Sequence, residues 1–223
     1  MVHLIREAER APEGALVLNH GRGADEHDLH GLLDELDPER RLIGVTPGAP
    51  LTNVPPGGRH WYVVRRVGYP DPATFDSSYG LLTSFLDGLL EERGVGWDRT
   101  VIGGFSMGAV MSYAVGLGPG RPSPAGIIAL SGFIPTVEGW HPELDARGAL
   151  PILIHHGRYD PVIQVEFGRR ARDALAGAGI EVGYLETDAG HWVPPEILPD
   201  LRQFVARATH GETADRTSRR RAV

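Results

Sequence analysis

The sequence predicts one α/β domain built around a mostly parallel sheet with helices on both faces. Short apolar runs rich in β-branched residues alternate along the chain with longer stretches that carry apolar residues at three- and four-residue spacing. This alternation is typical of repeated βα units, whose buried parallel strands are apolar on both sides. The chain has 223 residues, of which 41% are hydrophobic, so it can fill one sizeable core.

The strands are predicted from short apolar runs that are bounded by turn residues. They cover 15–20, 41–46, 61–66, 100–105, 126–131, 151–156 and 181–187. The first few residues of the chain are expected to add an antiparallel strand at one edge. The order of strands and intervening helices predicts a doubly wound sheet.

The helices are predicted from amphipathic stretches between the strands. They cover 25–37, 77–94, 106–117, 164–179 and 195–209. Gly94 and Gly179 stand where two of these helices end and a left-handed cap is needed. The Pro- and Gly-rich piece 47–61 is expected to be a long loop inside the domain. We place the domain at 1–209 and predict a disordered tail at 210–223, which has few apolar residues.

The composition excludes several classes of chemistry and partner. The net charge is −7 and no basic block precedes the last few residues, so we expect no nucleic-acid partner. No run approaches the roughly 18 to 20 apolar residues of a membrane span, and the first residues lack a signal peptide, so we expect a cytoplasmic protein without membrane insertion. There is no Cys, and all 22 basic residues are Arg. Cysteine nucleophiles and lysine Schiff bases are therefore excluded.

Ser106 is the candidate nucleophile, in the G-x-S-x-G sequence GFSMG at 104–108. It falls between the predicted strand 100–105 and the helix that follows, the context of a nucleophile elbow. Gly104 and Gly108 are small enough for strand and helix to pack closely at such a sharp turn. The start of the helix also directs backbone N–H groups and the positive end of the dipole towards an oxyanion.

His191 and Asp160 are the candidate base and acid. A serine hydroxyl needs a base that is itself oriented by a carboxylate, in the chain order Ser, acid, His. The histidines after Ser106 are His141, His155, His156, His191 and His210. Among them, His191 follows the last strand within the domain, and Asp160 follows the strand 151–156. Asp188 is an alternative acid, whereas His155 and His156 are expected to pack at the strand end.

The oxyanion is expected to be held by two backbone N–H groups. One belongs to Met107, and the other to Arg22 in the glycine-containing loop after the first strand. The Arg22 side chain either attracts an anionic part of a substrate or is simply solvated. Aromatic and apolar residues in the loops after the strands are candidate substrate-binding residues, with core packing as the alternative. They are Trp61, Tyr69, Phe75, Phe133, Ile134, Trp140 and Trp192.

No metal or cofactor is predicted. His27 and His30 lie one turn apart among acidic residues, but no H-E-x-x-H sequence is present and a solvated helix face explains the same letters. The chain also lacks a P-loop and a dinucleotide-binding glycine motif after a strand. We therefore expect a reaction that uses neither a metal nor a cofactor.

Several segments together resemble the small carboxylesterase/phospholipase family of α/β-hydrolases, which includes acyl-protein thioesterases and bacterial esterases. They are NHGRGADEHDL, GFSMGA, SGFIP, HGRYDPVI and AGHWVP, and the resemblance covers roughly residues 15–208. The resemblance implies an α/β-hydrolase fold with little or no lid, a triad of Ser106, Asp160 and His191, and an oxyanion hole at Arg22 and Met107. Many members have an apolar residue in place of Arg22 and Gln in place of Met107, which affects the expected substrate preference. The connection from Ser131 to Pro151 is itself too short for a lid domain, so we expect a shallow, open pocket.

We therefore expect a serine carboxylesterase that cleaves short- to medium-chain esters of small molecules through an acyl-enzyme. Thioester or lysophospholipid cleavage by the same triad is the alternative enzyme function. A hydrolase-like protein that only binds a ligand is the alternative of another class. The sequence leaves open whether the protein is a monomer or a homodimer.

Overall fold

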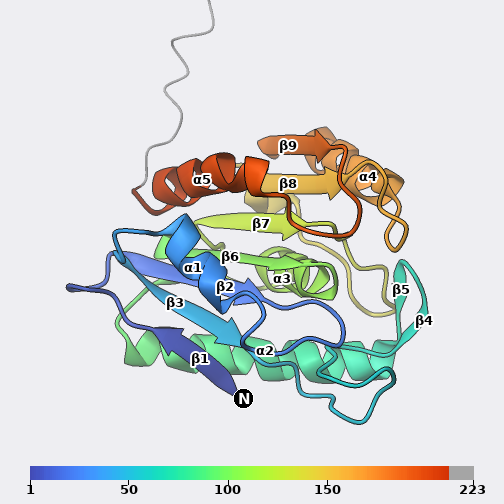
Figure 1. Ribbon diagram of the computed structural model, residues 1–223, viewed down its shortest axis with the longest axis horizontal. Helices are drawn as coiled ribbons and strands as arrows, with labels where there is room; N and C mark the ends of the chain where they lie inside the picture. The colour runs from blue at the N-terminus through green and yellow to red at the C-terminus, as the bar shows by residue number, and fades with distance from the viewer. Residues whose placement is uncertain (211–223) are drawn as a thin grey trace, which may run out of the picture.

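The computed structural model describes residues 1–210 and is built on a seven-stranded sheet in the order β1-β3-β2-β6-β7-β8-β9 (Figure 1). The strands are β1 (His3–Arg6), β2 (Gly14–Asn19), β3 (Leu42–Pro47), β6 (Thr100–Phe105), β7 (Gly126–Leu130), β8 (Ile152–Gly157) and β9 (Val182–Thr187). Strand β1 pairs antiparallel with β3, and all other neighbours in this sheet are parallel. The predicted α/β class and the antiparallel edge are confirmed.

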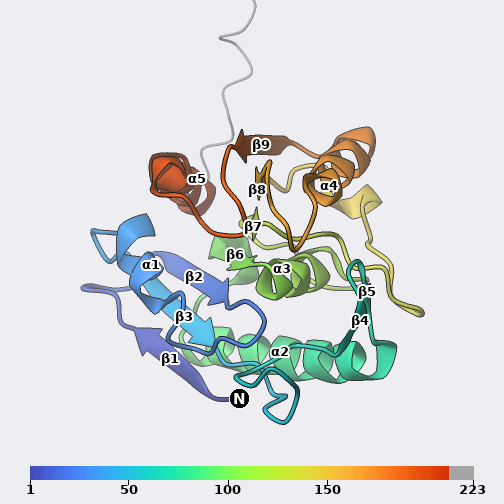
Figure 2. The ribbon, with the colours of Figure 1, turned by 45° about the vertical axis from the view of Figure 1, so that its right-hand side comes forward.

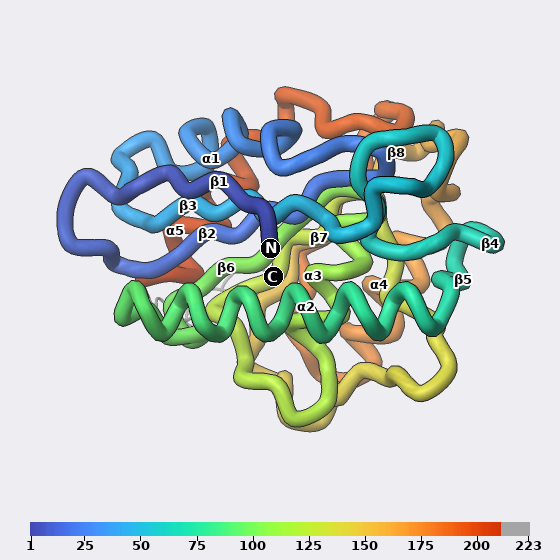
Figure 3. Tube along the Cα trace, turned by 90° about the horizontal axis from the view of Figure 1, so that it is seen from below, coloured from blue at the N-terminus to red at the C-terminus, as the bar shows by residue number. Residues whose placement is uncertain are grey.

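Helices cover both faces of the sheet. They are α1 (His30–Leu36), α2 (Pro72–Glu92), α3 (Met107–Leu117), α4 (Val165–Gly177) and α5 (Leu198–His210), with short 3₁₀ turns at Trp97–Arg99, Asp145–Arg147 and Pro195–Ile197. Figure 2 shows α1 and α5 on one face and α2, α3 and α4 on the other. Helix α2 is the longest, and it runs across most of the width of the fold in Figure 3.

The alternation of side chains along the strands explains why the strands are mostly apolar on both faces. In β2, Ala15 and Val17 belong to the core beneath α2, α3 and α4, whereas Leu16 and Leu18 belong to the core beneath α1 and α5. All four side chains are buried. A strand covered on both faces is apolar at most of its positions, which is the pattern that residues 15–18 show.

The predicted strand 61–66 is wrong. Trp61 and Tyr62 are buried in the core without joining the sheet, and the chain then forms a separate two-stranded hairpin. This hairpin consists of β4 (Val64–Arg66) and β5 (Tyr69–Pro70), and Gly68 turns it with a φ of 89°. Apolar and β-branched residues are typical of both environments, so the run alone did not separate a core loop from a strand.

Two predicted helix starts also change. Helix α1 begins only at His30, because the Asp25 side chain accepts a hydrogen bond from the N–H of His27 (2.9 Å) and holds residues before the helix in turns. Helix α2 begins at Pro72, five residues earlier than predicted, with Asp71 as its N-cap. The left-handed ends at Gly94 and Gly179 are confirmed, with φ values of 64° and 79°.

The predicted tail begins too early, since α5 continues to His210. The rest of that prediction, 211–223, lies outside the described residues. Among residues 1–210, no helix combines the length and the apolar character that crossing a bilayer requires.

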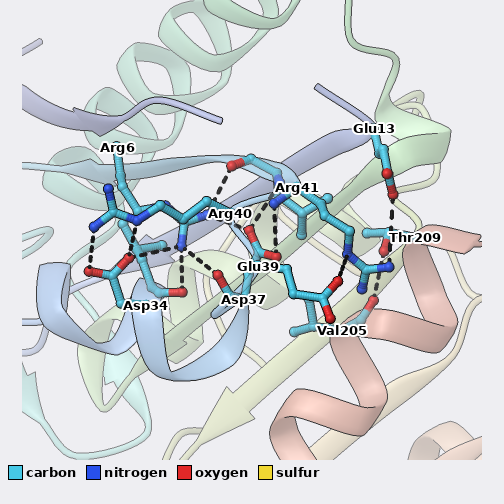
Figure 4. A network of polar contacts seen from close by, with 11 residues as sticks. Arg6, Glu13, Asp34, Asp37, Glu39, Arg40, Arg41, Val205 and Thr209 are labelled. Atoms are coloured by element: carbon cyan, nitrogen blue, oxygen red, sulfur yellow. Dashed lines mark hydrogen bonds and ion pairs between the residues drawn. The ribbon is translucent and has the colours of Figure 1, made fainter. Parts of the chain in front are cut away.

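A buried ion pair fixes the edge of the sheet. The guanidinium of Arg6 in β1 pairs with the carboxylate of Asp37, which directly follows α1, and their side chains are 5% and 2% exposed. Arg6 also donates to the carbonyls of Leu33 (2.7 Å) and Leu42 (2.9 Å), and Asp37 accepts from the N–H of Leu42 (2.9 Å). Figure 4 shows this pair beside the exposed Asp34 and Arg40. The pair therefore joins β1, α1 and β3. The hydrogen bonds to Leu33 and Leu42 take the place of bonds to water that the two charged groups lost on burial.

Candidate active site

Ser106 lies between the end of β6 and the start of α3, as predicted. Its backbone has φ 55° and ψ −118°, a conformation that L-residues rarely adopt and that the surrounding structure must hold in place. A Cβ atom at Gly104 would lie 2.6 Å from the carbonyl oxygen of Asn19 in β2, and one at Gly108 would lie 1.9 Å from the same oxygen. Both positions therefore require glycine for this turn to pack against the neighbouring strand.

The structure brings Ser106, His191 and Asp160 together. The Nε2 atom of His191 lies 2.9 Å from the hydroxyl of Ser106, and its Nδ1 atom lies 2.6 Å from a carboxylate oxygen of Asp160. Because a carboxylate only accepts, Nδ1 carries the proton and Nε2 is free to accept the serine proton. The other carboxylate oxygen accepts from the N–H groups of Val162 (2.8 Å) and Ile163 (2.9 Å), which fixes its direction.

The alternative acid, Asp188, lies outside this arrangement. Its side chain is 70% exposed and pairs with the guanidinium of Arg158. The loop after β9 thus carries His191 to Asp160 while Asp188 faces the solvent.

The tandem histidines of β8 are both buried but differ in position. His155 bonds through Nε2 to the hydroxyl of Thr187 (3.0 Å), and burial lowers its pKa to about 4. His156 donates from Nε2 to the carbonyl of Ile163 (2.7 Å), and that same nitrogen lies 3.7 Å from Asp160. His155 packs at the strand end as expected, whereas His156 additionally supports the loop that holds Asp160.

Arg22 and Met107 line the same pocket as Ser106. Met107 is the first residue of α3, where an N–H has no partner within the helix. Within residues 1–210, neither the N–H of Met107 nor that of Arg22 donates to another protein group. Both are therefore available to donate a hydrogen bond to an oxygen of a bound substrate. The Arg22 side chain is exposed and donates to the carbonyl of Pro55 (3.1 Å).

The pocket beside Ser106 has a volume of about 370 Å³. Its lining is mostly apolar, with Asp28, Arg22 and Arg66 as charged members. The hairpin β4–β5 forms one wall, and the loop after β8 forms another. The lining residues that sequence analysis missed are Gly21, Ala24, Asp28, Tyr62, Val64, Arg66, Val67, Gly68, Phe105, Val162 and Ile163.

Phe133 alone among the seven predicted substrate-binding residues lines this pocket. Trp61 and Phe75 are fully buried in the core, and Trp140 packs edge-on against Phe75 with ring centroids 6.2 Å apart. The others, Tyr69, Ile134 and Trp192, are also absent from the lining. The prediction placed these residues near the carboxyl ends of the strands, but it could not tell which side chains turn inward to the core.

Trp61 nevertheless lies beneath the pocket rather than in its wall. Its indole N–H donates to the carbonyl of His20 (3.0 Å), and its backbone N–H approaches the sulfur of Met107 (3.2 Å). One buried residue therefore links the loop of Arg22 to the start of α3, through its side chain on one side and its backbone on the other. Within residues 1–210, no group of three or more His, Asp or Glu side chains is arranged to hold a metal ion.

The fold and sequence are similar to those of known esterases and thioesterases. A Bacillus cereus carboxylesterase structure superposes with a TM-score of 0.80 at 19% identity, covering 92% of this chain and 93% of that one, which shows the shared fold. The structure of esterase PE8 superposes with a TM-score of 0.77 at 28% identity and covers 92% and 97% of the two chains.

Relatives known from sequence point the same way. An acyl-protein thioesterase 1 homolog from Dictyostelium discoideum is 25% identical over 86% of this chain and 89% of its own length. A putative hydrolase of Bacillus subtilis, MhqD, is 26% identical over 88% and 94% of the two chains. The phospholipase/carboxylesterase family matches residues 2–209, and this chain is therefore a hydrolase of that family, with the α/β-hydrolase fold.

Proposed function

We propose that this protein is a serine carboxylesterase that cleaves short- to medium-chain carboxylic esters through an acyl-enzyme. The observation that carries the proposal is the chain of hydrogen bonds from Ser106 to His191 (2.9 Å) and from His191 to Asp160 (2.6 Å), at the floor of an apolar pocket. Membership of a hydrolase family supports it.

In the proposed reaction, the Ser106 oxygen attacks the ester carbonyl while His191 takes the hydroxyl proton. The carbonyl oxygen becomes an oxyanion, which the N–H groups of Met107 and Arg22 hold. His191 then gives its proton to the leaving alcohol, and Asp160 stabilises the imidazolium formed between these steps. A water molecule repeats the sequence on the acyl-enzyme and releases the carboxylic acid.

The size of the pocket supports small acyl groups. Its volume of about 370 Å³ is near the lower end of the range for small-molecule sites, roughly 300 to 1,000 Å³. Val64, Val67 and Phe133 offer an apolar surface for a hydrocarbon chain. We therefore expect cleavage to decline once the chain outgrows this space.

Thioester cleavage is the second candidate, because several curated relatives of similar length are named acyl-protein thioesterases. Both reactions pass through the same tetrahedral intermediate, so the triad itself does not separate them. The cytoplasmic location predicted from the sequence also belongs to this proposal, and fractionation of cells that make the protein tests it.

The test is to label the purified protein with a fluorophosphonate, locate the adduct by mass spectrometry and measure a p-nitrophenyl ester series of rising acyl length. We expect one adduct on Ser106 and a maximum at short or medium chains. A matched acyl thioester series gives the preference between oxygen and sulfur leaving groups. The variant S112A is the control for S106A, because Ser112 lies in α3, which follows Ser106, but bonds to Asn19 and to the carbonyl of Gly108.

Full hydrolytic activity in S106A, or labelling elsewhere, would refute the mechanism. A folded protein that neither reacts with the fluorophosphonate nor hydrolyses any ester would instead favour the ligand-binding alternative. Hydrolysis of thioesters with esters untouched would favour the second candidate.

A further inference from the structure

His20 is a buried histidine that the proposed reaction does not use. It stands at the end of β2, directly before the loop that contains Arg22, and is 1% exposed. Its Nε2 accepts a hydrogen bond from the backbone N–H of Ala49 (3.0 Å), and its Nδ1 lies 2.7 Å from the carbonyl oxygen of Gly21. Both ring nitrogens are therefore engaged.

These two contacts fix the tautomer of the ring. A backbone N–H can only donate, so Nε2 must present its lone pair to Ala49, and the proton must lie on Nδ1. The Nδ1–H group then donates to Gly21. Burial also lowers the pKa of His20, which keeps the imidazole neutral at physiological pH.

The Gly21 carbonyl and the Arg22 N–H belong to one planar peptide group. A hydrogen bond that fixes the carbonyl therefore fixes the direction of the N–H on its opposite side. A second hydrogen bond to this carbonyl, from the N–H of Ala24, is 3.4 Å long and correspondingly weaker. A donor to the carbonyl also polarises the peptide, which strengthens its N–H as a donor.

We propose that His20 is a positioning residue that orients the Gly21–Arg22 peptide so that the Arg22 N–H points at the oxyanion. The inference rests on the proposed function, since it assigns a role within that reaction. His20 does not touch the substrate, because the group that faces the pocket is the Arg22 N–H. Its effect belongs to the transition state, where the oxygen carries a charge, and not to binding of the neutral ester.

The rest of the loop is anchored by other contacts. The Trp61 indole holds the carbonyl of His20, and the N–H of Gly23 donates to the carbonyl of Arg59 (2.9 Å). These bonds place both ends of the segment but do not act on the peptide between Gly21 and Arg22. The carbonyl of that peptide accepts the long bond from Ala24 (3.4 Å) and the much shorter one from His20 (2.7 Å), so His20 is its stronger restraint.

Two variants of His20 separate its two hydrogen bonds. In H20N, the amide nitrogen of Asn takes the place of Nδ1 and can still donate to Gly21, while the contact with Ala49 is lost. In H20Q, the amide oxygen of Gln reaches the place of Nε2 and can still accept from Ala49, while the donor to Gly21 is lost. The two variants therefore remove one bond each from the same buried site.

We expect H20Q to lower kcat for a p-nitrophenyl ester roughly 10- to 100-fold at a KM within about 2-fold of the wild type, since removal of a whole oxyanion donor costs about 100- to 1,000-fold. H20N should keep kcat within about 5-fold of the wild type, because the peptide stays oriented. The affinity for a boronic acid, which forms a tetrahedral adduct with the serine, should fall in H20Q in step with kcat/KM. The control is H155Q, which alters an equally buried histidine of β8 and should leave kcat unchanged.

The inference is overturned if folded H20Q keeps the wild-type kcat, or if H20N and H20Q lose activity equally and in step with their melting temperatures. Nitrogen NMR of the wild-type histidine rings gives a test that needs no variant, and it must find His20 neutral with its proton on Nδ1. A proton on Nε2 overturns the inference. Absence of fluorophosphonate labelling in the wild type would instead refute the proposed function, so the two failures are distinguishable.

Discussion

Asp160 uses its two carboxylate oxygens for different purposes. One oxygen accepts two backbone N–H groups within its own loop, and the other bonds to Nδ1 of His191. The carboxylate is buried, with charge-assisted hydrogen bonds that hold it in one orientation. The fixed carboxylate therefore fixes the orientation of the His191 imidazole, and with it the direction in which Nε2 faces Ser106.

The substitution D160N should leave the loop in place but lower kcat by about 1,000- to 10,000-fold, because the amide N–H₂ would donate to Nδ1 and force the proton onto Nε2. The amide oxygen can still accept from Val162 and Ile163, so the protein should remain folded. Steady-state kinetics with a p-nitrophenyl ester measures the effect. The control D188N, at an exposed position, should keep kcat within about 3-fold of the wild type. The reverse ranking of the two variants would show that Asp188 is the acid.

At this scale, the sequence predicted the grouping of Ser106, Asp160 and His191 because chain order and strand ends restrict where such residues can lie. It failed for Trp61 and Phe75, since an aromatic side chain near a strand end suits the core and the pocket equally well. The direction in which such a side chain points depends on the path of the backbone. His20 was also missed, because its role depends on one peptide plane that no residue pattern encodes.

At the level of elements, the turn from β6 to α3 is closely packed against its neighbours. A side chain at Gly108 would meet the carbonyl of Asn19, and a side chain at Gly132 would lie 2.5 Å from the Cβ of Ala109. Backbone atoms cannot move aside as a flexible side chain can. The start of α3 is therefore held against β2 and the loop after β7 at the point where Ser106 is presented.

The substitution G108A should destabilise the protein by several kcal/mol or prevent folding, because a methyl group would overlap the backbone of β2. The matched control is G88A on the exposed side of α2, where nothing lies within 4 Å of the added methyl group. That variant should gain about 0.5 to 1 kcal/mol, since alanine favours a helix interior. Urea denaturation of both variants measures the difference. Equal stability of the two would contradict the packing argument.

The elements that the sequence predicted best are those with a clear period and two buried faces. The strands from β2 to β9 in the central sheet agree with their predicted ranges to within one residue at each end. Short apolar runs bounded by turn residues fit few structures other than a buried strand. The hairpin β4–β5 was missed because its strands have only three and two residues, too few to show a period. Helix α2 was started too late although Asp71 and Pro72 form an N-cap signal in the sequence.

For the whole molecule, the Arg6–Asp37 pair contributes to stability by joining the edge strand β1 to α1 and β3. The variant R6M should lower the free energy of unfolding by about 3 to 5 kcal/mol, because it leaves a buried carboxylate without its cation. The control R40M, at an exposed pair with Asp34, should cost less than about 1 kcal/mol. Chemical denaturation measures both, and the fluorophosphonate reaction should be retained in both. A cost for R6M no larger than that for R40M would contradict this account.

The stability of the fold should fall in mild acid. Burial lowers the pKa of His155 from 6.5 to about 4 and also lowers those of His20 and His156. Between these values the unfolded chain binds more protons than the folded one, so stability is present above pH 6.5 and is lost as the pH falls towards 4. From pH 7 to pH 5, His155 alone should account for about 2 kcal/mol.

Urea denaturation of the wild type and H155Q at pH 7 and pH 5 checks this effect. The variant lacks the titrating group, so its stability should fall less between the two pH values, whatever its stability at pH 7. An identical fall in both proteins would show that His155 is protonated in the folded state without cost.

The hairpin β4–β5 should loosen at a lower temperature than the central sheet unfolds. Two short strands are only marginally stable by themselves. This pair is joined to the rest of the fold by Val64 on the core, by Gly68 beside the ring of Phe167 and by the ion pair of Arg65 with Asp71 (2.5 Å). The triad, in contrast, is carried by the central sheet. Heat should therefore release the pocket wall first, and the protein should lose its discrimination among acyl chains at a temperature where it still cleaves the smallest activated esters.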